Sequence, residues 1–437
     1  MIGSLRLAGR RKLLGMLLLI LPTLFAQRAR GQYVLEDMRD PNRYAPGPVF
    51  LPFLFYTSSY RLGGGMVWSS TGLLQPQTDT FALALGSVNG SYSLQAGLHN
   101  FQVEPIDRLF VGFEAGFSQQ NQFNAFVNGN PEFPHNGSGS NESSKENFIT
   151  VLDDDGWGQV SLSYLLPMGG GLEAIVNRYV LEDGLVKEGM TGGFGWNPLT
   201  TGRTYLQLTP NYEYQTLEVA TGDAHYDTNG LQFNVLYDNT DFPLNPSSGN
   251  TTRLSVERDF GLFNSTNTWT TYSGEFSQFI NLGQSRLFRQ QVLALDAWTC
   301  YSPTWHGPNR PGQGVRTAPP FYDGAVLGGS QRFRGFEDNR FHDRAAIYAS
   351  AELRLVPTWN PFKNISILKD ADITWMQWAV FGEIGRVSNE YSPDLLSHLK
   401  GDVGFGLRIL AKDTLVRFDV AASSEGYQLW VGLSEPF

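Results

Sequence analysis

A glycine-rich stretch that carries several arginines offers the clearest chemistry in this 437-residue chain. It runs Gly328-Gly329-Ser330-Gln331-Arg332-Phe333-Arg334-Gly335-Phe336, and an alternating run from Ala345 to Leu355 follows it. An arginine guanidinium is a planar fork of donors that suits a carboxylate, so Arg334 is a candidate for an ion pair that fixes this loop. The alternative is that these arginines lie on a solvated surface loop, together with Arg340 and Arg344.

The residue types that usually carry catalysis form no recognisable motif. The six histidines lack the short spacings of a metal site, and no Gly-x-Ser-x-Gly stretch is present. A hydrolase could still assemble a serine, a histidine and an acid from separate strands, which sequence order would hide. Since no motif supports that alternative, we predict no enzyme, no catalytic residues, no metal site and no cofactor. The histidines are His99, His135, His225, His306, His342 and His398.

Two local features have simple structural interpretations. Asp153-Asp154-Asp155-Gly156 could bind a divalent cation, but it lacks the remainder of a calcium-binding loop. A turn that precedes the next strand is the favoured interpretation. Cys300 is the only cysteine, which excludes an intramolecular disulfide and a cysteine zinc cluster, and we interpret it as a small strand residue.

The first residues have the order expected of a secretory signal peptide. Basic residues lie between Arg6 and Lys12, an apolar run extends from Leu13 to Ala26, and Ala29-Arg30-Gly31 provides a small-x-small step. The apolar run is too short to span a bilayer, and no later run approaches about 18 apolar residues. We therefore predict a signal peptide at 1–31 and an exported chain without membrane-spanning helices.

The composition favours a large lipid-facing surface. The chain has 30 Phe, 18 Tyr and 10 Trp but only 17% charged residues, which is too aromatic for disorder and too poor in charge for a typical soluble surface. A net charge of −10 argues against nucleic acid and against anionic lipid as partners. The alternative is a soluble, β-rich secreted protein with a large core.

Segments of roughly ten alternating residues recur from about Tyr60 to the end, which is the pattern of a transmembrane β-barrel. In residues 403–409, every second residue is apolar, and the residues between them are glycine or arginine. In the next segment, Arg417 lies on the opposite face of the strand from its apolar neighbours. The terminal run places Tyr427, Leu429, Val431 and Leu433 on one side and ends on Phe437. A β-sandwich strand also alternates, but the aromatic content, the export signal and the terminal phenylalanine favour a barrel.

The predicted fold is a single antiparallel transmembrane β-barrel of about sixteen strands over residues 60–437, after a short periplasmic segment at 32–59. The strands are expected near 60–70, 79–88, 92–102, 107–119, 155–166, 172–181, 203–216, 228–238, 249–260, 267–280, 286–300, 343–356, 376–386, 398–410, 414–421 and 426–437. Because connections alternate between two ends, Asn89-Gly90 and the 120–154 connection fall on the periplasmic side, and the long connection 301–342 falls outside. The 120–154 connection is long for a periplasmic turn, so it is either an ordered flap or a sign of a miscount.

Four stretches resemble the C-terminal barrel of the bacterial surface antigen superfamily, which includes BamA, TamA and the two-partner secretion transporters. Together they span most of the chain from about 230 to 437. Thr240 stands where the family usually has arginine, and Glu383 stands where it has aspartate. The stretches are Leu236–Gly249, the tripeptide Arg334-Gly335-Phe336, the strand segment Ala351-Glu352-Leu353-Arg354, and Phe381-Gly382-Glu383-Ile384-Gly385.

The resemblance implies that the 301–342 loop folds back into the barrel lumen. The expected partners of Arg334, Gly335 and Phe336 on the lumen wall are Phe381, Glu383, Gly385, Glu352 and Arg354. Strand alternation places Phe381 and Glu383 in the lumen, and Val380, Gly382 and Ile384 toward lipid. An Arg334–Glu383 pair would pin the loop, Gly335 would allow a tight turn, and Phe336 would pack against Phe381.

The resemblance also departs from the family pattern. Family members that assemble or translocate proteins generally carry periplasmic POTRA modules, which capture clients by strand addition. Residues 32–59 are too few for such a module, so we predict the barrel alone.

Two classes of function follow. In the first, the chain takes part in insertion or translocation of proteins or lipids at the outer membrane of a diderm bacterium, with a seam that Pro436 weakens. Its partners would be outer-membrane lipid, unfolded outer-membrane or exported proteins, and a separate periplasmic protein. In the second, it is a pore or structural barrel that the loop plugs. Neither class has a nucleic-acid partner or an identified small-molecule substrate.

Overall fold

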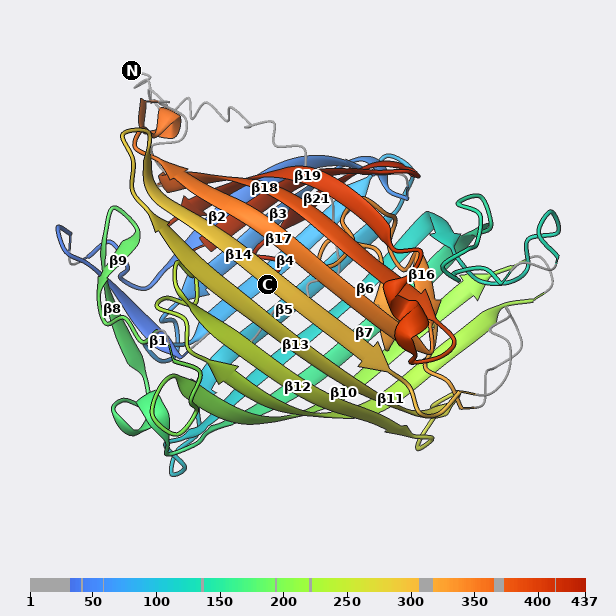
Figure 1. Cartoon of the computed structure of the whole chain (residues 1–437), viewed down its shortest axis with the longest axis horizontal. Helices are drawn as coiled ribbons and strands as arrows, with labels where there is room; N and C mark the ends of the chain where they lie inside the picture. The colour runs from blue at the N-terminus through green and yellow to red at the C-terminus, as the bar shows by residue number, and fades with distance from the viewer. Residues whose placement is uncertain are drawn as a thin grey trace, which may run out of the picture.

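Sixteen antiparallel strands, hydrogen-bonded in chain order, wrap around a central lumen (Figure 1). This computed structural model describes residues 32–40, 42–57, 59–134, 137–192, 195–219, 222–305, 317–364, 373–412 and 414–437. Within these ranges, no helix has the length and apolar character needed to cross a bilayer. The predicted signal peptide at 1–31 lies outside the described residues.

The wall strands are β2 (Gly47–Thr57), β3 (Arg61–Thr71), β4 (Asp79–Ser87), β5 (Tyr92–Gln102), β6 (Leu109–Ala125), β7 (Ile149–Leu165), β10 (Arg203–Glu218), β11 (Ala224–Asp238), β12 (Gly249–Phe260), β13 (Thr268–Gly283), β14 (Phe288–Tyr301), β17 (Ala345–Pro357), β18 (Ile373–Ser388), β19 (Lys400–Ala411), β20 (Thr414–Ser423) and β21 (Gly426–Gly432). Three strands form a separate sheet: β1 (Tyr33–Asp37), β8 (Asn177–Glu182) and β9 (Leu185–Glu188). The remaining elements are the β15 (Ala325–Leu327) and β16 (Phe341–Asp343) pair and the 3-10 turns η1 (Gly169–Leu172), η2 (Pro361–Asn364) and η4 (Pro393–Leu396).

The wall is apolar on the outside and polar on the inside. On β18, Val380 and Ile384 are 53% and 50% exposed, whereas Phe381 and Glu383 are 3% and 1% exposed. The same alternation exposes Val403 on β19 and buries charged side chains on the opposite parity. Since a water-soluble protein buries its apolar face instead, this arrangement confirms the predicted membrane barrel with a polar lumen.

The predicted count of sixteen is right, but one wall strand was missed and one predicted strand does not belong to the wall. Residues 47–57 form the first wall strand, so the predicted boundary of the barrel at residue 60 comes too late. The predicted wall strand at 172–181 is wrong, because its residues 177–181 belong to β8, which pairs with β1 and β9 in the separate sheet. The two errors cancel in number. For every connection that lies between these two errors in the sequence, however, they reverse the predicted end of the barrel.

That shift corrects two expectations. We define the loop end as the end that carries the 302–344 connection, and the turn end as the opposite one. Alternation from the observed strands places both the Asn89-Gly90 turn and the 126–148 connection at the loop end. These connections therefore share an end with the 302–344 connection, and their predicted position at the opposite end is wrong because of the miscount.

The residues Asp153-Asp154-Asp155-Gly156 do not form the predicted turn. They lie within β7, which pairs with β6 on one side and β10 on the other. Strand alternation turns Asp153 and Asp155 inward and Asp154 outward. Their carboxylates are therefore part of the lumen wall.

Segments outside the wall pack over both ends of the barrel. At the loop end, Arg340 donates to Ser143 Oγ at 2.9 Å, and the His342 backbone N–H donates to Gly139 O, so the 126–148 connection lies on the 302–344 connection. At the turn end, the β1-β8-β9 sheet places Tyr179 and Leu181 in a core with rim residues from several wall strands. These rim residues are Phe242, Leu244, Val356, Trp375, Leu410 and Leu415.

The revised sidedness predicts a labelling pattern. Val88 and Phe263, 74% and 93% exposed, lie in turns at the loop end, whereas Ile106, 49% exposed, lies in a turn at the other end. Single cysteines can be placed at these positions in a Cys300→Ala background, and intact cells can then be treated with a membrane-impermeant maleimide. Labelling at residues 88 and 263 should be alike, and labelling at residue 106 should differ from both. Equal labelling at residues 88 and 106 would contradict the observed order of strands.

Candidate functional site

The tip of the 302–344 connection reaches the lumen wall through Arg334. This side chain is fully buried, and its guanidinium contacts carboxylates from three different strands. Nε lies 2.9 Å from Glu383 Oε1, Nη2 lies 2.7 Å from Glu352 Oε1, and Nη1 lies 2.9 Å from Asp419 Oδ2. The Arg334 backbone N–H also donates to Glu383 Oε2 at 2.6 Å. The expected Arg334–Glu383 pair is thus present, as one part of a larger set.

Three further arginines belong to this set. Glu352 accepts from Arg354 at 2.8 Å and from Arg408 at 3.1 Å, and Asp419 accepts from Arg417 at 2.8 Å. Glu435 pairs with Arg408 at 2.8 Å. We refer to Arg334, Arg354, Arg408 and Arg417 with Glu352, Glu383, Asp419 and Glu435 as the arginine network. Its four positive and four negative formal charges balance, which matters because an uncompensated buried charge costs several kcal/mol, roughly 3–5 when one partner of a pair is removed.

Aromatic rings surround the network differently from the expectation. The Arg334 guanidinium carbon stacks 3.4 Å from the ring centroid of Phe381, which itself lies against Gly404, where any Cβ would meet the ring. Phe336 packs instead against Phe333 and Phe341, with ring centroids 4.7 and 5.1 Å apart. The predicted Phe336–Phe381 contact is therefore replaced by a cation–π contact of Arg334.

Gly335 is required for close approach. A Cβ built on it would lie 2.5 Å from Asp402 Cβ, and its backbone N–H donates to Asp402 Oδ2 at 2.7 Å. Gly385 on β18 makes similar room, since a Cβ there would lie 3.1 Å from Leu327 and 3.5 Å from Phe333. Both glycines therefore let the loop and the wall come together.

The Leu236–Gly249 stretch forms the end of β11, a turn and the start of β12. Asp241 organises the turn, because its carboxylate accepts from the backbone N–H groups of Ser247 and Ser248. Thr240, in the place of the family arginine, donates to Asp238 Oδ1 at 2.7 Å. A Cβ at Gly249 would lie 2.0 Å from Asn239 O, so this glycine is needed where strand and turn meet.

The model of the Omp85 superfamily domain matches residues 190–428, which is more than half of the chain. The protein belongs to the Omp85 superfamily. The resemblance drawn from the four stretches is confirmed by this match. No curated protein matches the sequence.

Solved structures of Omp85 proteins resemble this barrel at low sequence identity. CdiB from Escherichia coli is 12% identical with a TM-score of 0.52, over 89% of this chain and 60% of its own. BamA from Haemophilus ducreyi lacking POTRA domains 1–3 is 13% identical with a TM-score of 0.49, over 89% and 68%. CdiB from Acinetobacter baumannii is 12% identical with a TM-score of 0.48, over 88% and 58%. At these identities the likeness to E. coli CdiB supports the fold alone.

In this Omp85 barrel the chain leaves the wall after Gly432 and turns into the lumen (Figure 1). Glu435 joins the arginine network, and Phe437 stacks on Phe279 of β13 with ring centroids 6.3 Å apart. The Arg354 guanidinium lies 4.8 Å from the Phe437 ring centroid. The tail 433–437 and the loop tip are thus held by one set of charges.

The two ends of the wall overlap instead of meeting edge to edge. Because Arg417 and Asp419 face the lumen, Val416 faces outward on β20. Val416 nevertheless shares one apolar cluster with Val431 and Leu433 and with inward-facing side chains of the first strands, which are Phe53, Phe55, Val67, Leu83 and Leu85. In the described part of the chain no ladder joins β2 to β21. We refer to this contact of β20–β21 with the inner face of β2–β4 as the seam.

The overlap explains the burial of the terminal strand residues. Tyr427, Leu429, Val431 and Leu433 share one parity, as expected, but Tyr427 is 74% exposed while Val431 and Leu433 are 5% and 6% exposed. Ser69 Oγ, on the inner face of β3, lies 3.0 Å from Thr414 Oγ1 of β20. The β20–β21 ladder ends at the Arg417–Gly432 pair, so this contact lies beyond its end.

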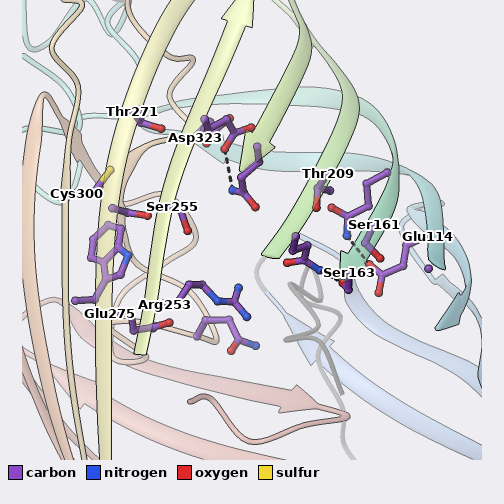
Figure 2. Close-up of a pocket in the computed structure, with 18 of the residues that line it drawn as sticks. Glu114, Ser161, Ser163, Thr209, Arg253, Ser255, Thr271, Glu275, Cys300 and Asp323 are labelled. Carbon is purple, nitrogen blue, oxygen red and sulfur yellow. Dashed lines mark hydrogen bonds between the residues drawn. The ribbon is translucent and has the colours of Figure 1, made fainter. Parts of the chain in front are cut away.

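The other side of the lumen holds a polar cavity of about 440 Å³ (Figure 2). Hydroxyl groups and carboxylates of several wall strands point into it, together with Asp323 of the 302–344 connection (Figure 2). Those of the wall include Glu114, Ser161, Ser163, Thr209 and Ser255. Cys300, a buried residue of β14, also lines it, which agrees with its interpretation as a small strand residue. The lumen is therefore filled on the β17–β20 side and hollow on the β5–β14 side.

Several residues of the site were not singled out from the sequence. They are Arg408, Asp419 and Glu435 of the arginine network, and Asp402, which accepts from the Gly335 backbone N–H. The sequence did contain one indication of these residues. In β19 and β20, charged residues occupy the alternate positions that face inward, between apolar residues that face outward. A charge repeatedly placed on the inner parity of a membrane strand requires a partner of opposite sign.

We expect Arg334→Lys to destabilise the folded barrel although it keeps the charge. A lysine ammonium cannot place planar donors against three carboxylates and stack on Phe381, so the loss should be about 2–4 kcal/mol. Chemical unfolding in detergent measures it, with Arg286→Lys at an exposed turn position as the matched control. Equal stability of both variants would contradict a structural role for the three-way contact.

Gly335→Ala should also destabilise the barrel, by about 1–3 kcal/mol, because its methyl group would overlap Asp402. Gly382→Ala is the matched control, since a Cβ there meets nothing closer than 3.8 Å. Unfolding curves of both variants provide the comparison. A larger effect of the Gly382 substitution would show that close approach at residue 335 is unimportant.

Proposed function

We propose that this Omp85 barrel takes part in inserting or translocating proteins or lipids at the outer membrane of a diderm bacterium. The substrate would pass at the seam. Family membership supports the class of function, and the overlap of β20–β21 with β2–β4 is the observation that supports the place.

The seam differs physically from the rest of the wall. Other neighbouring strands are joined by ladders, such as the eleven pairs from Gly47–Thr71 to Thr57–Arg61 between β2 and β3. Parting such strands breaks a row of backbone hydrogen bonds, which is costly where water cannot replace them. Apolar side chains and one hydroxyl pair contribute to the seam, and lipid or substrate side chains can replace apolar contacts. We therefore place the opening of the wall at the seam.

The arginine network links the seam to the loop. Glu435, just beyond β21, pairs with Arg408, which also contacts Glu352, the carboxylate that Arg334 approaches. Movement of β21 would thus disturb the charges that hold the loop tip. Partners that dock at either end of the barrel could influence the seam by this route.

A plugged pore is the second candidate. The polar cavity of about 440 Å³ favours it, because its lining suits water and small polar solutes. In that case the loop blocks conduction through the barrel. Depletion of the protein would then change the uptake of solutes, while the amounts of the other outer-membrane proteins would stay the same.

A disulfide across the seam separates these functions. In a Cys300→Ala background, the Ser69→Cys/Thr414→Cys pair should cross-link, because the two native hydroxyl oxygens are 3.0 Å apart. We expect the oxidised protein to fail to restore the outer-membrane proteome of depleted cells, and dithiothreitol to reverse the failure. Quantitative proteomics of outer membranes measures this.

The control pair is Thr71→Cys/Asp79→Cys, which links two strands that are already joined by a ladder. It should restore the proteome whether oxidised or reduced. Full restoration by the oxidised seam pair would show that function does not need the seam to open. An unchanged proteome after depletion, together with altered uptake of small solutes, would favour the pore.

A further inference from the structure

A second, smaller cavity lies between the loop and the β5–β10 part of the wall. Its volume is about 50 Å³. Four of the side chains that line it are carboxylates: Asp153 and Asp155 of β7, Glu213 of β10, and Asp338 of the loop. The described residues around this cavity include no lysine, arginine or histidine. The balance of charge seen in the arginine network is therefore missing here.

Buried oxygens at this cavity provide independent evidence for a ligand. Asp153 Oδ1, Gln215 Oε1 and Gln95 Oε1 each lack a hydrogen-bond partner. Their residues are 1%, 6% and 8% exposed and come from three different strands. All three atoms are acceptors, and leaving one buried acceptor unsatisfied costs about 1–3 kcal/mol. Three such oxygens call for a ligand that a buried acceptor can bind, either a hydrogen-bond donor or a cation, and the four carboxylates around the cavity favour a hydrated cation.

We propose that this cavity binds one hydrated divalent cation of the Ca²⁺ or Mg²⁺ class. Carboxylate and amide oxygens are ligands that these hard cations prefer. Within the described ranges, no three histidine, cysteine, aspartate or glutamate side chains are grouped to hold a bare metal ion. The ion therefore keeps water molecules between itself and some of the carboxylates, as Mg²⁺ commonly does. At about 10–15 Å³ for each water, the cavity has room for an ion and a few waters.

The cation would tie the loop to the wall opposite the arginine network. Asp338 belongs to the 302–344 connection and lines the cavity together with Asp153, Asp155 and Glu213 of the wall. Like charges repel, so carboxylates from loop and wall at one cavity oppose their own association. A divalent ion between them would turn this repulsion into attraction. The loop would then be held by its arginine ion pairs and, opposite the arginine network, by the cation.

Titration of refolded protein with CaCl₂ or MgCl₂ tests the proposal. The protein should be in a non-ionic detergent, free of lipopolysaccharide and stripped with EDTA, so that the barrel is the only source of binding sites. We expect calorimetry to show about one site per chain. We also expect either salt to raise the unfolding temperature, whereas NaCl at equal ionic strength should not.

Asp153→Asn and Glu213→Gln should each weaken binding at least tenfold. Asp154→Asn is the matched control, because it removes the same charge from the other face of the same strand and should leave binding unchanged. The shift between folded and unfolded bands on a gel establishes that each variant is folded. If a wall variant does not fold, Asp338→Asn on the loop provides the same test.

Four results would overturn the proposal. Three are the absence of saturable binding by folded wild-type protein, equal stabilisation by NaCl, and binding by the cavity variants that matches wild type. Equal loss in Asp154→Asn would also overturn it, since binding would then depend on overall charge.

Discussion

The arginine network buries four arginine side chains in the lumen, and they depend on the four carboxylates of the same network. Glu352 is the centre of the arrangement, since Arg334, Arg354 and Arg408 all approach it. Only Arg334 comes from outside the wall, so the loop supplies one charge of a set that the wall leaves incomplete. The position of the loop, the stacking on Phe381 and the inward turn of the tail all follow from satisfying these charges.

The two halves of the lumen solve the problem of buried charge differently. Around β17–β20, opposite charges are packed against one another and leave little space. Around β5–β14, carboxylates and hydroxyl groups face cavities that water and ions can enter. The loop lies between these halves and contacts both, through Arg334 on one side and through the Arg332–Glu275 ion pair, at 2.8 Å, on the other.

Much of this could be predicted from the sequence, because strand alternation is a local property. The inward positions of Phe381 and Glu383 were predicted in this way, whereas the Arg334–Glu383 pair was predicted from the family resemblance, which places the loop in the lumen. The contacts of Arg334 with Asp419 were not, since nothing local links residues that lie 85 positions apart. Pairing across a barrel depends on the order and stagger of all the intervening strands.

The first wall strand was missed for a physical reason. Residues 49–56 are almost uniformly apolar, because Phe50 is exposed on the outer face while Phe53 and Phe55 pack against the seam. When both faces of a strand are apolar, its sequence no longer alternates between apolar and polar residues. Conversely, 177–182 alternates because the small sheet has one face on the barrel rim and one in solvent. Alternation reports the two environments of a strand, and it does not identify the sheet to which the strand belongs.

The overlapping ends also bear on the girth of the barrel. In a wall closed by ladders, the perimeter is fixed by the number of strands, each of which contributes about 4.8 Å. Here Val416 of β20 and Val431 of β21 pack against the inner face of β2–β4, whereas Val420 and Tyr427 on the same parity are exposed, so the overlap is confined to the part of these strands near the turn end. If this part slid outward by two strand widths, the perimeter at the turn end would lengthen by roughly 10 Å while the described ladders stay intact. The overlap thus offers a way for the circumference at the turn end to change without a change in the number of strands.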